Sequence, residues 1–175
     1  MNRSFIFIIL FFSFAIQAQD VAKIDKLYAG QSLDDARHAY PDATFKEVDG
    51  WTYCVDGESK GYIIEFNGTA RFFVYSLYEE NLIANISILS SHNSIMDGLY
   101  VGMTFEKLLA KHPDLKLRID DLCEDEYVYF SGTSIALIFN TTEKNRIGIY
   151  DGGPGSYELV GYAEDLSKKV DRIRL

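Results

Sequence analysis

Five carboxylates stand within seven residues of this chain, and acids at this density bind cations or contact basic proteins. They belong to the run Asp120-Asp121-Leu122-Cys123-Glu124-Asp125-Glu126. The run does not match a calcium loop, in which ligands alternate around a central glycine and end on a glutamate. We interpret it as a solvated acidic turn between strands. The alternative is a docking patch in which Asp121, Glu124 and Asp125 contact lysines and arginines of a partner.

Cys54 and Cys123 are the two thiols of the chain. They lack the Cys-x-x-Cys spacing and the neighbouring histidine of a metal site, so the sequence predicts no metal. Bonded to each other, they would close a long loop, which chain entropy values at roughly 4 kcal/mol. Two free, buried thiols are the competing interpretation, and the sequence leaves that choice open.

The chain has three histidines, His38, His92 and His112. None of them lies beside a nucleophile motif, and the sequence contains neither Gly-x-Ser-x-Gly nor His-Glu-x-x-His. The glycine-rich stretch 152–155 has no lysine for a phosphate, and its proline removes one N–H donor. The sequence therefore predicts a protein without catalysis and without a cofactor.

Aromatic side chains are abundant, with twelve Tyr, twelve Phe and one Trp. Several occupy alternate positions of predicted strands, where they point to one face of a sheet. On an exposed face they would form a rigid surface of the kind enriched at binding hot spots, and on the helix side they would be core. The preference for Tyr over Phe favours the exposed interpretation. The pairs are Trp51 with Tyr53, Phe73 with Tyr75, and Tyr127 with Tyr129.

A repeated segment determines where these residues lie. Residues 24–42 recur 72 positions later as residues 96–114, with identities at Leu27/Leu99 and Gly30/Gly102. Each copy reads as a helix entrance with Ser32 or Thr104 as N-cap. Pro41 and Pro113 end the two helices.

Period-two runs follow each proline and predict antiparallel strands. We expect an α+β fold of two tandem repeats, each a short helix packed on an antiparallel β-meander, with repeat 1 at 19–92 and repeat 2 at 93–175. The second repeat has about fifteen extra residues, a Gly-rich loop insertion near 151–165. Asp151 and Tyr157 lie there, and an inserted loop is a candidate binding site. The predicted strands are 43–48, 51–56, 62–66, 70–78, 82–89, 115–119, 126–130, 135–140, 146–151 and 170–175.

The N-terminus predicts export. Basic Arg3 precedes an apolar run over 5–16, and cleavage is expected before Gln19. This pattern is typical of a signal peptide at 1–18. The run is short for a membrane span, so we expect none in the mature chain, which would be periplasmic or secreted.

The net charge of the chain indicates which classes of partner it can bind. The net charge is −9, and loss of residues 1–18 makes it −10. Such a chain repels the phosphates of nucleic acid, so the sequence predicts no nucleic-acid partner. A basic protein is the partner that we expect, and acidity kept for solubility is the alternative.

The two helix entrances, Gly102-Met103-Thr104 and Gly30-Gln31-Ser32, each precede antiparallel strands in an exported chain. This layout resembles the beta-lactamase inhibitor protein family. In that family the concave sheet face and inserted loops grip the target through aromatic and acidic side chains. The resemblance implies that the counterparts here are Trp51, Tyr53, Tyr127, Tyr129 and the loop 151–157. The family has a disulfide within each repeat, whereas this chain has one cysteine per repeat.

The expected function is protein binding. The chain would occlude a secreted or envelope enzyme, or a toxin, as an inhibitor or immunity protein. The first alternative is a structural or assembly component of the cell envelope. The second is a small hydrolase or ligand carrier, which a deep pocket with convergent carboxylates or a histidine would indicate.

Overall fold

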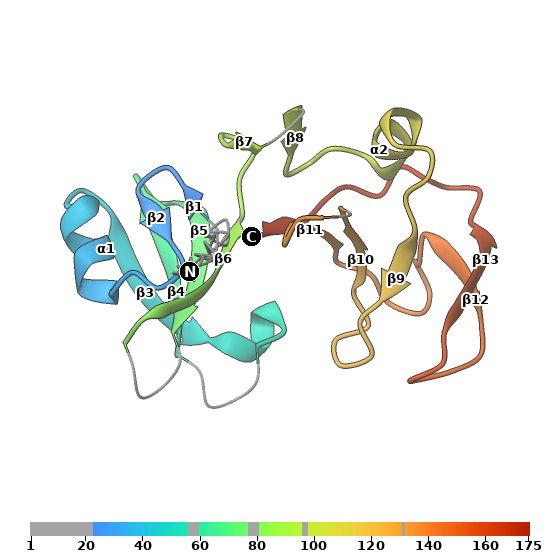
Figure 1. Ribbon diagram of the computed structural model, residues 1–175, viewed down its shortest axis with the longest axis horizontal. Helices are drawn as coiled ribbons and strands as arrows, with labels where there is room; N and C mark the ends of the chain where they lie inside the picture. Colours follow the sequence, from blue (N-terminus) through green and yellow to red (C-terminus); the bar gives the residue numbers. More distant parts are fainter. Residues whose placement is uncertain (1–22, 56–59, 77–80, 96–97, 131) are drawn as a thin grey trace, which may run out of the picture.

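A computed structural model describes residues 23–55, 60–76, 81–95, 98–130 and 132–175 (Figure 1). The expected signal peptide, residues 1–18, lies outside these ranges. Across the described ranges, no helix combines the length and the apolar character needed to cross a membrane.

The first half begins with a two-stranded ribbon, β1 (Lys23–Ile24) paired with β2 (Leu27–Tyr28), and continues into α1 (Leu33–Ala39). Ser32 is the N-cap of α1, and its hydroxyl accepts from the N–H of Asp35 at 3.0 Å. The remaining elements are β3 (Thr44–Asp49), the 3-10 helix η1 (Gly50–Tyr53), β4 (Lys60–Phe66), β5 (Thr69–Ser76) and β6 (Ile83–Ile88).

The second half begins in the same way, with a ribbon followed by a capped helix. Thr104 caps α2 by accepting from the N–H of Lys107 at 3.4 Å. Both predicted helix entrances are therefore confirmed. The elements are β7 (Ser94–Ile95), β8 (Leu99–Tyr100), α2 (Phe105–Lys111), β9 (Leu117–Ile119), β10 (Glu126–Tyr129), β11 (Ala136–Phe139), β12 (Gly148–Asp151), β13 (Glu158–Tyr162) and β14 (Arg172–Arg174).

One antiparallel sheet of eight strands runs through both halves in the order β3-β4-β5-β6-β14-β11-β10-β9. The halves meet where β14 pairs with β6, opposing Ile173 to Ile88, near the middle of Figure 1. β3 and β9 are the two outer strands. The fold is α+β and mostly sheet.

Both helices pack on the same core. Leu33 and Ala36 of α1, and Phe105 and Leu108 of α2, are buried in a cluster with one face of the large sheet. The sheet residues of this cluster include Ile64, Phe72, Val74, Ile86, Ile88, Val128, Leu137 and Ile173. The opposite face of the sheet is free of helices α1 and α2, and the Cys54–Cys123 disulfide lies on that side.

The predicted strand at 51–56 is wrong, because residues 50–53 form the 3-10 helix η1. Asp49 starts η1 by accepting from the N–H of Trp51 at 3.0 Å. Such a local bond offers the backbone an alternative to the ladder of a sheet. Cys54 ends η1 in the left-handed region, with a φ of 61°.

The insertion near 151–165 is more ordered than the expected Gly-rich loop. β12 and β13 pair as a hairpin, and the loop proper is confined to 152–157. Gly152 has a φ of 87°, and a Cβ there would lie 2.5 Å from the carbonyl oxygen of Ser156. The turn therefore requires glycine at this position.

Candidate functional site

The face of the large sheet that is opposite α1 and α2 carries two of the predicted aromatic pairs. Val128, Leu137 and Ile173 point into the core, so their neighbours along each strand point to the opposite face. Strand register then sets the members of this face side by side across the five strands β5, β6, β14, β11 and β10. They are Phe73, Tyr75, Ser87, Arg172, Arg174, Ile138, Tyr127 and Tyr129.

The 3-10 helix η1 folds over part of this face. Tyr53 stacks on Phe73 with ring centroids 4.0 Å apart, and Phe73 is 1% exposed. Gly61 makes room for the ring, since a Cβ there would lie 2.6 Å from Phe73. Phe73 therefore supports the surface from beneath, and Tyr75 is half-buried. Trp51, in contrast, is 51% exposed.

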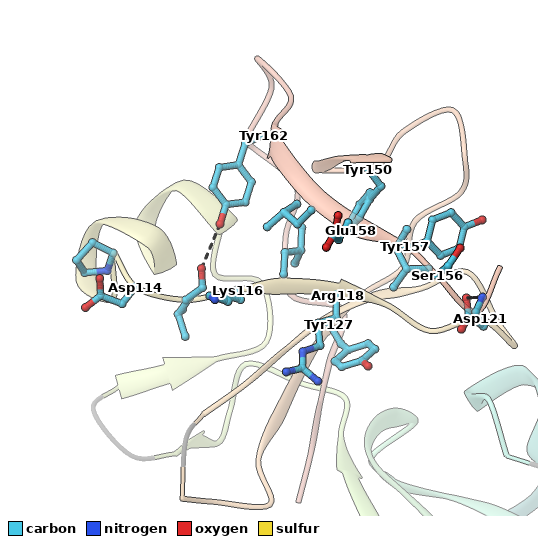
Figure 2. A pocket seen from close by; sticks show the side chains of 16 residues that line it. Asp114, Lys116, Arg118, Asp121, Tyr127, Tyr150, Ser156, Tyr157, Glu158 and Tyr162 are labelled. Atoms are coloured by element: carbon cyan, nitrogen blue, oxygen red, sulfur yellow. Dashed lines mark hydrogen bonds between the residues drawn. The ribbon is translucent and has the colours of Figure 1, made fainter. Parts of the chain in front are cut away.

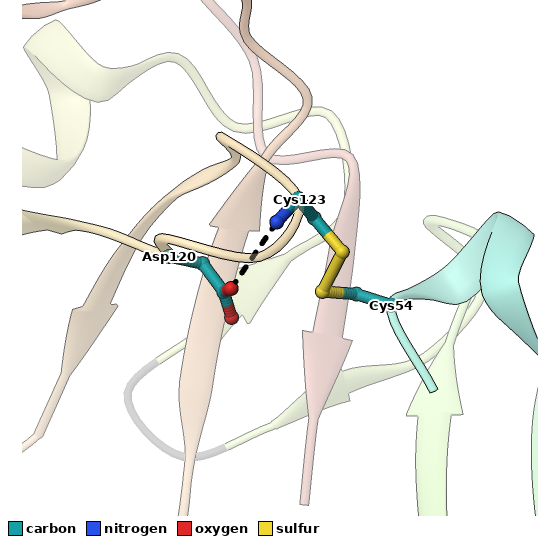
Figure 3. A group of neighbouring side chains, drawn as sticks. All are labelled: Cys54, Asp120 and Cys123. Carbon is teal, nitrogen blue, oxygen red and sulfur yellow. Dashed lines mark hydrogen bonds between the residues drawn. A yellow bond between two sulfur atoms is a disulfide. The ribbon is translucent and has the colours of Figure 1, made fainter. Parts of the chain in front are cut away.

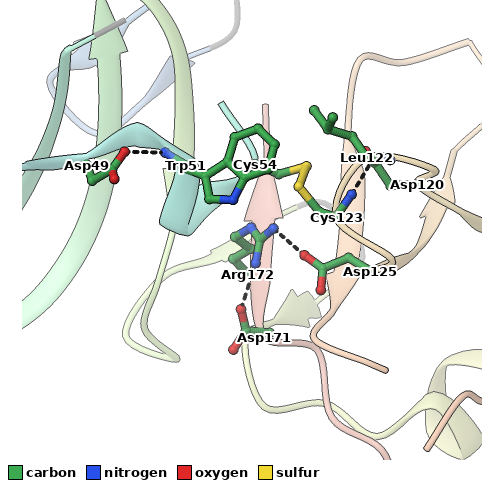
Figure 4. Close-up of a disulfide and its surroundings, with 9 residues drawn as sticks. All are labelled: Asp49, Trp51, Cys54, Asp120, Leu122, Cys123, Asp125, Asp171 and Arg172. Carbon is green, nitrogen blue, oxygen red and sulfur yellow. Dashed lines mark hydrogen bonds and ion pairs between the residues drawn. A yellow bond between two sulfur atoms is a disulfide. The ribbon is translucent and has the colours of Figure 1, made fainter. Parts of the chain in front are cut away.

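A disulfide joins the two halves across this face. Cys54, after η1, bonds to Cys123 in the turn between β9 and β10, with Cα atoms 5.9 Å apart (Figure 4). Asp120 shapes this turn by accepting from the N–H groups of Leu122 at 2.9 Å and Cys123 at 3.3 Å. Leu122 is 56% exposed. Exposed apolar side chains thus stand on both turns that the disulfide connects.

The same disulfide bears on metal binding. Cys54, Asp120 and Cys123 place three ligand-type atoms within 4.8 Å of one another (Figure 3). Both sulfurs are bonded to each other, however, and a metal requires thiolates. The group is therefore a structural staple with a carboxylate that shapes its turn.

The acidic run is less solvated than expected, because the protein itself binds several of its carboxylates. Asp125 is buried and lies 2.6 Å from Arg172. Asp121 accepts from the N–H of Gly155 at 3.0 Å but remains exposed. Glu124 lies 3.9 Å from Arg146 and keeps a largely exposed side chain. Of the three predicted docking acids, Asp121 and Glu124 are open to a partner and Asp125 is not.

Arg172, which is not among the site residues predicted from the sequence, lies on β14 in the middle of the sheet. Its buried guanidinium pairs with Asp125 and with Asp171 at 3.0 Å, and lies over the ring of Tyr53. Burial raises the pKa of Tyr53, Asp171 raises it further, and Arg172 opposes the rise. No local pattern signals this role, since an arginine next to Ile173 in an alternating strand is expected to face solvent.

A groove of about 880 Å³ lies between the edge strand β9 and the hairpin β12–β13 (Figure 2). Two hydrogen bonds join its walls: the Tyr162 hydroxyl donates to the carbonyl of Leu115 at 3.1 Å, and Gly155 donates to Asp121. Tyr157 lines the groove, whereas Asp151 is exposed at the end of β12 and is not among the lining residues. Tyr127, Tyr150 and Lys116 line it as well.

Buried Glu126 anchors the hairpin. It is 0% exposed and accepts from the N–H groups of Ile147 and Gly148, both at 2.7 Å, and from the Tyr150 hydroxyl at 3.0 Å. Burial, and then the carboxylate of Glu126, raise the pKa of Tyr150. The sequence held a signal for this anchor, because Glu126 occupies the same strand face as core residue Val128.

The carboxylates of the groove do not converge. Asp114 lies toward one end, Asp121 toward the other and Glu158 between them, as Figure 2 shows. General acid–base chemistry requires groups that reach the same reacting atoms. The groove instead offers tyrosine rings, two cations and a strand edge, which are the elements of a binding surface.

No family model matches this chain, and no curated protein matches it. The chain is similar in fold to the crystal structure of the uncharacterized protein YfeY from Escherichia coli. The TM-score is 0.53 at 17% identity, with 85% of this chain and 92% of that chain covered. At this identity the similarity concerns the fold alone. The resemblance to the beta-lactamase inhibitor protein family stays a prediction.

Proposed function

We propose that this chain is an exported protein-binding module that occludes a secreted or envelope enzyme, or a toxin, as an inhibitor or immunity protein. One observation supports this most. Trp51 and Leu122 are both more than half exposed, and they stand on the two turns that the Cys54–Cys123 disulfide joins. We call Trp51, Leu122 and Tyr129 the disulfide surface.

The disulfide surface is held in place before any partner arrives. The N–H of Trp51 is bound to Asp49 and that of Leu122 to Asp120, so both turns are fixed locally as well as by the disulfide. Tyr129 is 47% exposed and packs edge-on against Tyr127. Large apolar groups on a fixed backbone lose little entropy on binding, and Trp and Tyr are enriched at hot spots.

The disulfide also supports export. A disulfide is compatible with an oxidising compartment, such as the periplasm or the extracellular space. This supports the prediction that residues 1–18 direct the chain out of the cytoplasm.

We also infer that the two halves are tandem copies of one unit. Corresponding contacts support this: Gly30 donates to the carbonyl of Ile83, and Gly102 donates to that of Val170, both at 2.8 Å. In each half these bonds tie the lead-in of the helix to the closing segment of that half.

The test is affinity capture with matched variants. The full chain, the variant W51A/L122A and the control I149A/V160A are immobilised and exposed to an envelope fraction and culture medium. The control removes two apolar side chains that are also about half exposed but lie on the hairpin, away from the disulfide. A protein retained by wild type and control but lost by W51A/L122A supports the proposal, and stoichiometric loss of its activity identifies inhibition. Equal capture by all three chains overturns it.

A further inference from the structure

Strand β9 leaves one edge of the large sheet open. Among the described strands, none pairs with its outer side. The N–H of Asp120 donates to the carbonyl of Asp125, and hydrogen-bonded positions alternate along an antiparallel pair. The backbone groups of Leu117 and Ile119 therefore point outward. Such groups are the donors and acceptors with which an added strand pairs.

Two hollows flank this edge, and Lys116 and Arg118 line both of them. The groove beneath the hairpin is one of them. The other, of about 590 Å³, is lined by His112, Lys116, Arg118 and Tyr129. Figure 2 shows Arg118 and Tyr127 on the opposite side of β9 from Tyr150 and Glu158. A strand directs successive side chains to opposite faces, so a chain paired with β9 would fill both hollows alternately.

The chemistry of the two sides differs. Lys116 and Arg118 lie at alternate positions along the edge and are exposed. Within the described residues neither forms a salt bridge, and Arg118 contacts the Tyr127 hydroxyl. On the hairpin side the groove presents Leu159 and the ring of Tyr150, together with the carboxylate of Glu158, which repels acidic side chains. One side therefore favours acidic side chains and the other apolar ones.

We infer that β9 accepts an extended segment of the partner as an added strand, in which acidic residues alternate with apolar ones. This inference rests on the proposed protein-binding function and specifies one segment of the partner. Leu115 already has internal partners for both backbone groups, since its N–H donates to His112 and its carbonyl accepts from Tyr162. The open edge therefore runs from Lys116 to Asp121, roughly 17 Å at about 3.3 Å a residue, which suits a segment of about five or six residues. A second copy fits poorly, because two antiparallel β9 strands would bring Lys116 and Arg118 of both copies together.

The probe is a fluorescent eight-residue peptide in which Glu alternates with Val, and its control has Lys in place of Glu. Binding to the full chain is measured by fluorescence anisotropy. We expect the Glu peptide to bind at least about tenfold more tightly, and added salt to narrow that difference. The variant K116E/R118E reverses the preference. The matched variant K144E/K169E makes the same charge change at exposed residues away from the groove and keeps the preference.

Backbone pairing has its own test. Two Glu peptides carry N-methyl groups on alternate residues, in the two possible frames. The frame that blocks the bonds to β9 lowers the affinity at least about tenfold, whereas the other frame binds like the parent peptide. Equal binding in both frames, or no preference for Glu over Lys, overturns the inference. Dissociation of a dimer of the chain by the peptide also overturns it, because the edge would then belong to a second copy.

Capture of the partner separates this inference from the proposed function. If W51A/L122A loses the partner and K116E/R118E retains it at full affinity, the module binds protein without using β9. If neither variant changes capture, the proposed function itself fails.

Discussion

Removing the disulfide is the most direct test of how the two halves are held together. Cys54 and Cys123 are 69 residues apart, and cross-linking removes from the unfolded chain the freedom of a loop of that length. The loop-closure relation gives an entropy near 15 cal/mol/K, or about 4 kcal/mol at 25 °C. The double variant C54A/C123A should lose that amount from its free energy of unfolding.

The assay is urea unfolding followed by circular dichroism, with and without a reductant. Reductant should lower the stability of the wild type to that of C54A/C123A and leave the variant unchanged, which controls for other effects of the substitutions. A loss below about 1 kcal/mol would refute the reasoning. It would mean that the unfolded chain already keeps these segments close together, or that the bond strains the folded state by a similar amount.

Further variants test the interior and the surface separately. Glu126→Gln should lower the free energy of unfolding by about 2–4 kcal/mol, because two buried N–H groups lose their charged acceptor. Hydrogen exchange at the amide of Gly148 should become faster in this variant. An unchanged exchange rate would contradict the anchoring role of Glu126. Burial raises the pKa of Tyr40 to about 12, so the folded chain keeps a proton that the unfolded chain loses above pH 10. The free energy of unfolding should therefore fall between pH 10 and 12, by roughly 1–3 kcal/mol for this group. In urea titrations at several pH values, Tyr40→Phe should make that fall smaller. If the variant loses as much stability over this pH range as the wild type, other groups cause the fall. Tyr129→Ala should change the free energy of unfolding by no more than about 0.5 kcal/mol while weakening partner capture. Phe73→Ala should lower the free energy of unfolding by about 3 kcal/mol or more. Similar losses for the two variants would mean that Tyr129 is part of the packed interior.

Local chemistry made much of the fold predictable. The helices begin where Ser32 and Thr104 cap them, because a hydroxyl at that position binds an N–H within the next few residues. The period-two runs around β4, β5, β6 and β10 also formed strands, since alternation follows from the pleat itself. These signals depend on neighbours in sequence.

The candidate site depends on contacts between distant residues, which sequence patterns do not carry. Arg172 and Asp125 are 47 residues apart, and Glu126 reaches Gly148 across 22. Phe73 alternates like an exposed strand residue but is covered by Tyr53 of η1, which replaced the predicted strand at 51–56. The groove exists because the insertion folded into a hairpin opposite β9, and composition alone indicated only a loop.

The central position of β14 determines when the sheet can be completed. Without residues 172–174 the sheet separates into a four-stranded and a three-stranded part, and β6 and β11 each expose an unpaired edge. Synthesis adds β14 after the other described strands, so a growing chain cannot close this sheet before residues 172–174 are made. Cleavage ahead of β14 would thus break the sheet at its middle rather than shorten it at one side.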